Sequence, residues 1–595
     1  MFGIAGVLGE RDPSLIKKMT DSLRHRGPDH SGYFYSSLCD LGVRRLRIVD
    51  MASGDQPIYN ENGTMCVVFN GEIYNYKELR HRLVRKGHLF KTKTDTEVVV
   101  HLYEEYGDDC VKLLHGMFAF AIADNNKLFL ARDRLGIKPL YFSHNTSQGL
   151  FVFASEIKAL LRCAEIPVSV DTETLANVRV LGHNFGNRTF FSDIYSLEPG
   201  HTLQITYTNN RPQLQKKKYW ELRIEPDNTL SLEQCKNICA SLLKKAVKSH
   251  LQGDVPVCLA LSGGLDSSIL ALEMSRGIGA TLETFTVSGD DPRTQDPSYA
   301  RGVAEYIQSK HHEVRYSFED SLNDIPSLVL ATEEPYIMNM AMFNLCREAR
   351  GFKVCVIGEG ADELFGGYYQ QFIAHTKTIS RMEQSLADAQ KEGLPVGGNV
   401  VDYVRRMSYT TSDQHVYLRE YFLANLTNQL IHRHLELFDK ISMAFGLEIR
   451  LPYLDDALVD FANRIPFNLK INKSAGEGKY ILKMVALSEY GTALASVVKR
   501  PKETLPHANN AFFAAFNDLC EKMVPDTYVM KHQYSMFFPN EQFISWGVGQ
   551  RNLTLRAAKR KAILFDLFSF IFLEKKGVVP ADFNFRKFIA ERTKS

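Results

Sequence analysis

Several features that would quickly assign this chain to a class are missing from it. Its ten cysteines include no C-x-x-C pair, so neither a cysteine-based zinc site nor a disulfide framework is indicated. A net charge of +2 gives no attraction to nucleic acid or to an acidic membrane. No basic segment followed by an apolar run opens the sequence, and the longest apolar stretch, 562–573, is too short to span a bilayer. We therefore expect a soluble, cytoplasmic protein with no nucleic-acid or membrane partner.

The order of patterns along the 595 residues predicts two different halves. Residues 1–205 alternate short β-rich runs with turns, and helical patterns near 77–86 and 95–105 interrupt them. This mixture predicts an α+β domain. Residues 206–220 begin with a polar run that contains Pro212, so we expect a surface loop or linker there.

Helical patterns dominate from residue 221 to residue 595. Apolar runs at 255–261, 282–287 and 353–357 are predicted to be buried strands. Strands that alternate with helices are typical of a parallel sheet covered by helices. The second half is therefore predicted to be an α/β domain rich in helices.

A glycine-rich turn follows the first of these apolar runs. The string S-G-G-L-D-S-S at 262–268 joins the run to an apolar helical stretch. Such a turn aims backbone N–H groups and the positive end of a helix dipole at an anion. No lysine stands in the position that a P-loop kinase or GTPase requires, so a different phosphate site is predicted. The residues predicted to form this phosphate site are Ser262, Gly263, Gly264, Asp266, Ser267 and Gly358, and the family likeness described below implies that the phosphates are those of ATP.

A second acidic, glycine-rich segment, 358–368, follows the apolar run that ends at Ile357. Parallel strands deliver their carboxyl ends to one edge of a sheet, where ligands bind. We therefore expect Asp362 to face Asp266 across a metal ion and Glu359 to face the substrate.

Together these motifs resemble the glutamine-hydrolysing asparagine synthetases, whose PP-loop domain cleaves ATP to AMP and pyrophosphate. The likeness covers most of the chain and includes the segments 442–455 and 478–483. It implies ATP and Mg²⁺ as cofactors, with Asp266 and Asp362 as the metal ligands. It also implies two catalytic residues. Lys479 stabilises charge on the phosphate and later on the oxyanion, and Glu359 orients or deprotonates the incoming amine.

The first half resembles a class II glutamine amidotransferase, which implies an Ntn-hydrolase-like αββα sandwich. In that family the second residue is a cysteine, whose thiol attacks the glutamine amide and whose α-amine is the base. Here the second residue is Phe2, which has no nucleophilic atom and should also block removal of Met1. Other signatures of the family remain, such as R-H-R-G-P-D at 24–29 and F-N-G-E-I-Y-N at 69–75. We therefore expect a domain without glutaminase activity that maintains its fold and its interface with the synthetase half.

By the same likeness, Arg45 and Asp95 clasp the α-carboxylate and α-amine of glutamine, and Asn70 and Gly71 form the oxyanion hole. Binding of glutamine without hydrolysis stays open. The predicted remnant of the glutamine pocket comprises Phe2, Arg45, Asn70, Gly71, Glu72 and Asp95.

The expected function is that of an ATP-dependent amide ligase. It activates a carboxylate, aspartate or a related acid, as acyl-AMP and couples it to ammonia or another amine. Segments 332–341 and 500–507 depart from the acid-binding patterns of asparagine-forming relatives, which weakens the case for aspartate. Two alternatives stay open: a β-lactam-synthetase-like or specialised-metabolite ligase that uses a larger amine, and a catalytically retired regulatory paralogue. The expected partners are a small carboxylic acid and ammonia or an amine, and a homodimer is a candidate assembly.

Overall fold

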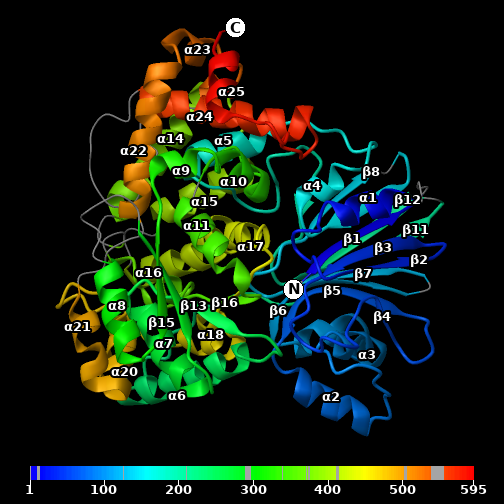
Figure 1. The fold of residues 1–595 in the computed structure, drawn as a ribbon, viewed down its shortest axis with the longest axis vertical. Coiled ribbons are helices and arrows are strands. Elements are labelled where there is room, and N and C mark those ends of the chain that lie inside the picture. The colour runs from blue at the N-terminus through cyan, green and yellow to red at the C-terminus, as the bar shows by residue number, and fades with distance from the viewer. Residues whose placement is uncertain are drawn as a thin grey trace.

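The fold comes from a computed structural model of the chain. A β-rich first half and a helix-rich second half lie side by side (Figure 1). The structure describes residues 2–594 except for 10–13, 125, 146, 210, 289–295, 338, 370–371, 373–374, 410–413, 501–505 and 538–554.

The first half is built on two antiparallel sheets. Its strands are β1 (Phe2–Leu8), β2 (His30–Tyr35), β3 (Cys39–Arg45), β4 (Ile58–Tyr59), β5 (Cys66–Ile73), β6 (Gly116–Ala123), β7 (Leu128–Arg132), β8 (Tyr141–Asn145), β9 (Leu150–Ala154), β10 (Tyr195–Ser196), β11 (His201–Thr208) and β12 (Arg211–Lys218). One sheet has the order β10-β8-β9-β1-β3-β2 and the other has the order β12-β11-β7-β6-β5-β4. Apolar side chains from both sheets, such as Ile4, Val43 and Phe120, share one buried core.

Helices cover the outer faces of these two sheets. They are α1 (Leu15–Asp21), α2 (Tyr76–Arg85), α3 (Glu97–Tyr106) and α4 (Ile157–Leu160). Another helix, α5 (Thr172–Leu181), packs against α14 (His375–Lys391) of the second half instead. Helix α1 packs on the β1–β3 sheet, and α3 packs on the β4–β5 side of the other sheet, so the layers run α, β, β, α (Figure 1). This arrangement confirms the predicted Ntn-hydrolase-like αββα class. The predicted helices near 77–86 and 95–105 correspond to α2 and α3.

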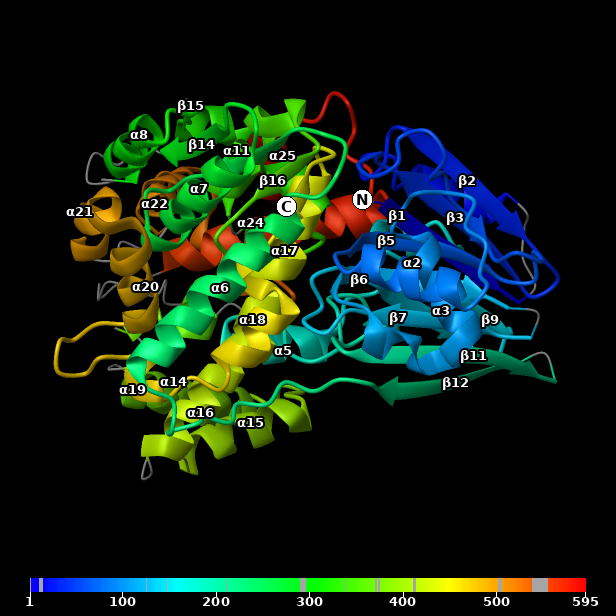
Figure 2. The ribbon, with the colours of Figure 1, turned by 90° about the horizontal axis from the view of Figure 1, so that it is seen from below.

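Strands occupy most of the segment 206–220, where the sequence predicted a loop or linker. β11 pairs with β12 as an antiparallel hairpin, in which Ile205 lies opposite Leu214. β12 is an edge strand of its sheet, which explains its composition. An edge strand tolerates Pro212, because a missing N–H there breaks no ladder, and exposed lysines at an edge discourage pairing with other chains. After β12 the chain crosses to the helical half (Figure 2). The exact domain boundaries stay predictions.

A five-stranded parallel sheet forms the centre of the second half. Its strands are β13 (Val257–Ala260), β14 (Glu283–Ser288), β15 (Lys310–Arg315), β16 (Val354–Val356) and β17 (Glu448–Arg450), in the order β15-β14-β13-β16-β17. All four neighbouring pairs are parallel. The three predicted strands are therefore confirmed. The sequence missed β15 and β17 because both are short and mostly polar.

Helices surround this sheet and fill the rest of the second half. Those used below are α6 (Leu232–His250), α7 (Leu265–Gly277), α8 (Asp296–Tyr306), α10 (Ile325–Thr332), α11 (Met340–Glu348), α12 (Ala361–Phe365), the π-helix η4 (Asn425–Leu435), α17 (Glu436–Met443), α20 (Tyr480–Tyr490) and α21 (Ala495–Lys499). The remaining α-helices are α9 (Phe318–Leu322), α14 (His375–Lys391), α15 (Gly398–Tyr409), α16 (Gln414–Ala424), α18 (Asp456–Ala462), α19 (Phe467–Lys470), α22 (Pro506–Met523), α23 (Asp526–Lys531), α24 (Leu555–Ser569) and α25 (Phe585–Arg592). Helices α7, α8 and α11 pack against the sheet. The predicted helix-rich α/β class is confirmed.

One stretch, Tyr480–Lys499, is long and apolar enough to cross a membrane by length and composition alone. Gly491, with a φ of +53°, ends α20 within this stretch. Ile481, Leu482 and Val485 of α20 are buried in the core of the second half. A buried core helix passes the same test, so the stretch is weak evidence for a membrane span, and the location of the protein stays a prediction.

Candidate active site

The predicted phosphate loop lies between β13 and α7, at the carboxyl end of the parallel sheet. Gly263 has a φ of +71°, and a Cβ there would lie 2.4 Å from the backbone nitrogen of Ala300, so only glycine fits. The hydroxyl of Ser262 lies 3.1 Å from that of Ser267 and accepts a hydrogen bond from the N–H of Gly264 at 3.3 Å. The loop therefore has a defined shape, and Ser262 remains exposed at its surface.

Three predicted residues from separate parts of the chain meet beside this loop. The ammonium of Lys479 forms ion pairs with the carboxylates of Asp266 and Asp362, the latter at 2.7 Å. Two glycines permit this approach. A Cβ on Gly367 would lie 1.6 Å from Asp362 Oδ1, and a Cβ on Gly358 would lie 3.2 Å from Asp266 Cβ. The structure thus brings the phosphate loop, both acids and the lysine together, while their roles remain predictions.

The two aspartates suit a magnesium ion. Mg²⁺ takes oxygen ligands and is usually bound through one or two carboxylates together with substrate phosphates. Asp266 Oδ1 is buried and has no hydrogen-bond partner among the described residues, so it has a lone pair to offer. Lys479 supplies positive charge to the same pair of carboxylates.

Glu359 lies near the start of α12 and has a partner that the sequence did not reveal. His434, on the π-helix η4, places Nδ1 2.8 Å from Glu359 Oε1. Burial lowers the pKa of His434, but the charges of Glu359 and Glu363 and the interaction with the Glu359 carboxylate together outweigh burial, so the net shift is upward. Behind this pair Glu363 accepts a hydrogen bond from the hydroxyl of Tyr368 at 2.6 Å, and burial raises the pKa of Glu363. A lone histidine in a helical run carries no sequence signal, and only the fold reveals this contact.

In the first half, Phe2 lies where the likeness places the nucleophile. It sits on β1 directly opposite Arg45 on β3. Its side chain is buried in the sandwich core, edge-on to Phe69 with ring centroids 6.5 Å apart. Its backbone N–H donates to Asn70 Oδ1 at 3.1 Å. An aromatic ring therefore fills this position, and Asn70 binds the chain itself.

Both residues of the predicted glutamine clasp have partners within the protein, although Arg45 Nε is buried without a hydrogen-bond partner among the described residues. Arg45 is 1% exposed, pairs with Asp55 and donates to the carbonyl oxygens of Val49 at 3.0 Å and Asp50 at 2.7 Å. Asp95 accepts hydrogen bonds from the N–H of Ile73 at 2.8 Å and the hydroxyl of Thr94 at 3.0 Å. Burial raises the pKa of Asp95. Both residues thus have structural partners where a ligand clasp was predicted.

The last two residues of the predicted remnant lie on β5. At Gly71 a Cβ would lie 2.0 Å from the carbonyl oxygen of Met117, so the backbones of β5 and β6 require glycine there. Glu72 points to the second half, where its carboxylate lies 3.0 Å from Arg450 on β17. Burial raises the pKa of Glu72, and Arg450 acts in the opposite direction. Glu72 therefore belongs to the contact between the halves.

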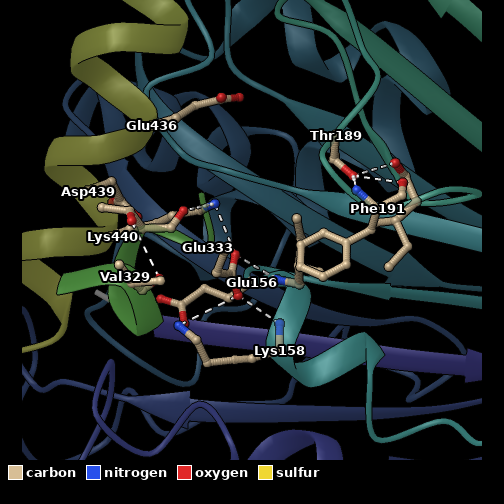
Figure 3. Close-up of polar contacts among 12 residues, drawn as sticks. Glu156, Lys158, Thr189, Phe191, Val329, Glu333, Glu436, Asp439 and Lys440 are labelled. Carbon is tan, nitrogen blue, oxygen red and sulfur yellow. Dashed lines mark hydrogen bonds and ion pairs between the residues drawn. The ribbon is translucent and has the colours of Figure 1, made fainter. Parts of the chain in front are cut away.

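A buried network of charges joins the two halves, which we call the junction network (Figure 3). Asp439 of α17 pairs with two cations of the first half, Arg26 at 2.7 Å and Lys138 at 3.1 Å. Arg26 also pairs with Glu156 at 2.8 Å and donates to the carbonyl oxygen of Phe2 at 3.2 Å. The pairing is therefore continuous from β1 to α17.

Glu333 makes a second connection in this network. Its carboxylate accepts hydrogen bonds from the N–H groups of Ile157 at 3.0 Å and Lys158 at 2.7 Å, so it caps α4 of the first half. It also pairs with Lys440 of α17 at 2.9 Å. Glu333 belongs to the segment in which we sought the acid-binding residues. In this chain that segment gives one carboxylate to the junction instead.

This fold and this site define a class of protein, an ATP-dependent ligase that forms carbon–nitrogen bonds with release of AMP and pyrophosphate. The sequence matches the family described as "Asparagine synthase" over residues 239–553 and the "Glutamine amidotransferase domain" over residues 1–220. The chain belongs to the asparagine synthetase family.

Three relatives show the extent of the likeness. The Bacillus subtilis (strain 168) proteins "Asparagine synthetase [glutamine-hydrolyzing] 3" and "1" are 31% and 30% identical, over 79% and 82% of this chain and 81% and 84% of their own. "Asparagine synthetase [glutamine-hydrolyzing] 3" of Arabidopsis thaliana is 38% identical over 62% of this chain and 61% of its own.

Proposed function

We propose that this protein activates a carboxylic acid, aspartate or a related acid, as acyl-AMP and couples it to ammonia or another amine taken from solution, without a glutaminase of its own. The observation that carries this proposal is the meeting of Lys479 with Asp266 and Asp362 beside the phosphate loop. A regulatory paralogue without catalysis would have no need of this arrangement.

In the first step, an oxygen of the substrate carboxylate attacks the α-phosphorus of ATP, and the bond to pyrophosphate breaks. Negative charge grows on the phosphate oxygens, and the ammonium of Lys479 is placed to stabilise it. Lys479 is only 6% exposed, and a fixed charge stabilises another charge more strongly where water is excluded. Asp266 and Asp362 would hold Mg²⁺, which when bound offsets the charge of the phosphates.

In the second step, the amine nitrogen attacks the acyl carbon, and AMP leaves with the electron pair of the broken C–O bond. The attacking nitrogen must lose a proton, which Glu359 accepts. His434 pairs with Glu359 at 2.8 Å and orients that carboxylate. Glu359 and Lys479 are the catalytic residues of this proposal.

The amine comes from solution, because the first half has no nucleophile at Phe2. The side chain there is a phenyl ring packed against Phe69, and no atom in it can attack an amide. The larger-amine alternative belongs to the same proposal, since Glu359 can accept a proton from any attacking nitrogen. Homodimer assembly stays a prediction.

Pyrophosphate–ATP exchange, screened across carboxylic acids, tests this proposal. We expect exchange that depends on one acid and on Mg²⁺, with AMP as the nucleotide product once an amine is added. Stoichiometric release of ADP and phosphate would contradict it. Mass spectrometry of the product with ammonium, larger amines or glutamine as the nitrogen source then identifies the amine.

A further inference from the structure

We propose that the first half contains a transition-metal site, formed by His88, His101, Glu61 and Glu104, which takes Zn²⁺ or a similar dication. These residues come from three places: Glu61 follows β4, His88 follows α2, and His101 and Glu104 lie one turn apart on α3. One donor atom from each lies within 4.8 Å of the others. The site is separate from the phosphate loop and from the Phe2 position.

The distances among these donors suit a metal ion better than a set of hydrogen bonds. His101 Nδ1 lies 3.4 Å from Glu61 and 3.9 Å from Glu104, and His88 Nδ1 lies 2.9 Å from Glu61 and 3.8 Å from Glu104. Ligands at about 2.0–2.2 Å from Zn²⁺ in a tetrahedron are about 3.3–3.6 Å apart. The contact of His88 with Glu61 is a hydrogen bond, whereas the other three exceed a normal N···O hydrogen bond and leave room for a central ion.

His101 gives the strongest single indication. It is 0% exposed, yet neither ring nitrogen has a hydrogen-bond partner in the part of the chain that the structure describes. Leaving buried polar atoms unpaired costs about 1–3 kcal/mol each. A metal ion bound at Nδ1 gives that buried nitrogen a partner, and the ring of His88, whose centroid is 5.0 Å away, lies close enough to share the ion.

His88 has the outer hydrogen-bond partner that metal-binding histidines usually have, and the outer nitrogen of His101 faces a carboxylate at a longer distance. A ligating histidine commonly donates its other ring N–H to a carboxylate, which fixes the tautomer. Here His88 Nε2 lies 3.1 Å from Glu105, and His101 Nε2 faces Glu97 at 3.7 Å. Both Nδ1 atoms therefore point to the inner pair, Glu61 and Glu104.

Charge and access support the same assignment. The N–H of Leu89 donates to Glu61 Oε1 at 3.0 Å, which holds this carboxylate in place beside the two imidazoles. The side chains of Glu61 and Glu104 are 28% and 29% exposed, which leaves the site a route to solvent. Two nitrogen and two carboxylate donors form a set that Zn²⁺ accepts. Four protein ligands give a structural site, which would fix the α2–α3 region to the sheet.

Titration of the metal-free, full-length protein with Zn²⁺ by calorimetry tests the proposal, and Co²⁺ absorption reports four-coordinate geometry. We expect saturable binding of one ion per chain and a higher midpoint of thermal unfolding with Zn²⁺. His88→Gln and His101→Gln should each weaken Zn²⁺ binding by more than about 100-fold. Mutation of residues that only hydrogen-bond to metal ligands already lowers metal affinity by about 10–100-fold, and loss of a ligand should lower it further. His88→Gln is the main test, since its side chain is less deeply buried than that of His101.

Two matched controls locate the ion. His81→Gln alters an exposed histidine of α2 and should leave binding unchanged. His434→Gln alters a second group of donors, Glu359, Glu363 and His434, which also lie within 4.8 Å of one another. The proposal is overturned by absence of saturable binding in the wild type, by wild-type affinity in folded His88→Gln, or by loss of the ion in His434→Gln alone. These readouts measure metal binding and are independent of amide synthesis.

Discussion

The two halves of this molecule both bury charged side chains, but they bury them for different purposes. At the edge of the parallel sheet, Lys479 and two aspartates form a compact set beside an exposed glycine-rich loop, where phosphate can approach. In the sandwich, Arg45 and Asp95 form hydrogen bonds with other residues of the same half, near the buried phenyl ring of Phe2. The comparison shows that family motifs indicate catalysis only where two further features are present. These are the reacting atom and a path by which the substrate can reach it.

The junction network is the feature through which the first half should matter most to stability. Asp439→Asn removes a buried carboxylate that pairs with both Arg26 and Lys138, while Arg26 keeps its pair with Glu156. We therefore expect the free energy of unfolding to fall by about 3–5 kcal/mol. The control is Asp518→Asn, which alters an exposed ion pair with Arg556. It should change the free energy of unfolding by less than about 0.5 kcal/mol. Denaturant unfolding measures both. Equal effects would mean that the network is not a structural link.

Replacement of Lys479 should slow the reaction without unfolding the protein. Lys479→Ala should slow pyrophosphate exchange by on the order of 10²–10³, or about 3–4 kcal/mol, because a fixed donor to developing charge is lost. Lys483→Ala, one turn further along α20 and paired with Glu477, is the matched control. Exchange at the wild-type rate in Lys479→Ala would remove this residue from the mechanism.

The pair Glu359–His434 should affect the second step more than the first. Glu359→Gln should slow amide formation by about 10²-fold and leave most pyrophosphate exchange. His434→Gln should have a smaller effect of the same kind, since it only orients the carboxylate, and should shift the pH profile of amide formation. His432→Gln, whose histidine pairs with Glu436 instead, is the control. Equal loss of exchange and amide formation in Glu359→Gln would contradict this division of roles.

A pH effect on stability should come from Glu334, next to the junction. Burial raises the pKa of Glu334 from 4.5 to about 8. The folded state then binds a proton that the unfolded state releases, so stability should fall as pH rises between about 4.5 and 8, by up to about 1.4 kcal/mol per pH unit. Glu334→Gln should flatten that slope in denaturant unfolding at several pH values. An unchanged slope would assign the effect to another group.

The smallest effect is expected from returning the missing thiol. A chain processed to begin at the substituted residue of Phe2→Cys should regain slow hydrolysis of glutamine, because Arg45, Asp95 and Asn70 are still in place. Phe2→Ser is the control, since a hydroxyl at the same position is a poorer nucleophile. Glutamate release measures this. No release from the correctly processed cysteine variant would mean that the first half is wholly structural.

Much of this arrangement was predictable from sequence, and the failures have physical causes. The phosphate loop and Asp362 were predicted from glycine-rich segments that follow apolar runs. This was possible because the end of a buried strand followed by glycines is a pattern of neighbouring residues in the sequence. The hairpin at 201–218 was missed because an edge strand has the composition of a loop. His434 and the metal site were missed because they depend on residues far apart in sequence. Arg26 belongs to the signature at 24–29, which we expected to maintain the fold and the interface with the second half, and it lies in the junction network.

The central claim is that synthesis proceeds in the second half with nitrogen from solution. The most direct test supplies wild-type protein with ATP, the acid found by exchange, ¹⁵N-labelled ammonium or the preferred labelled amine, and unlabelled glutamine together. The account predicts AMP and pyrophosphate, an amide that carries only the label, and no glutamate. An unlabelled amide formed in step with glutamate release would contradict it.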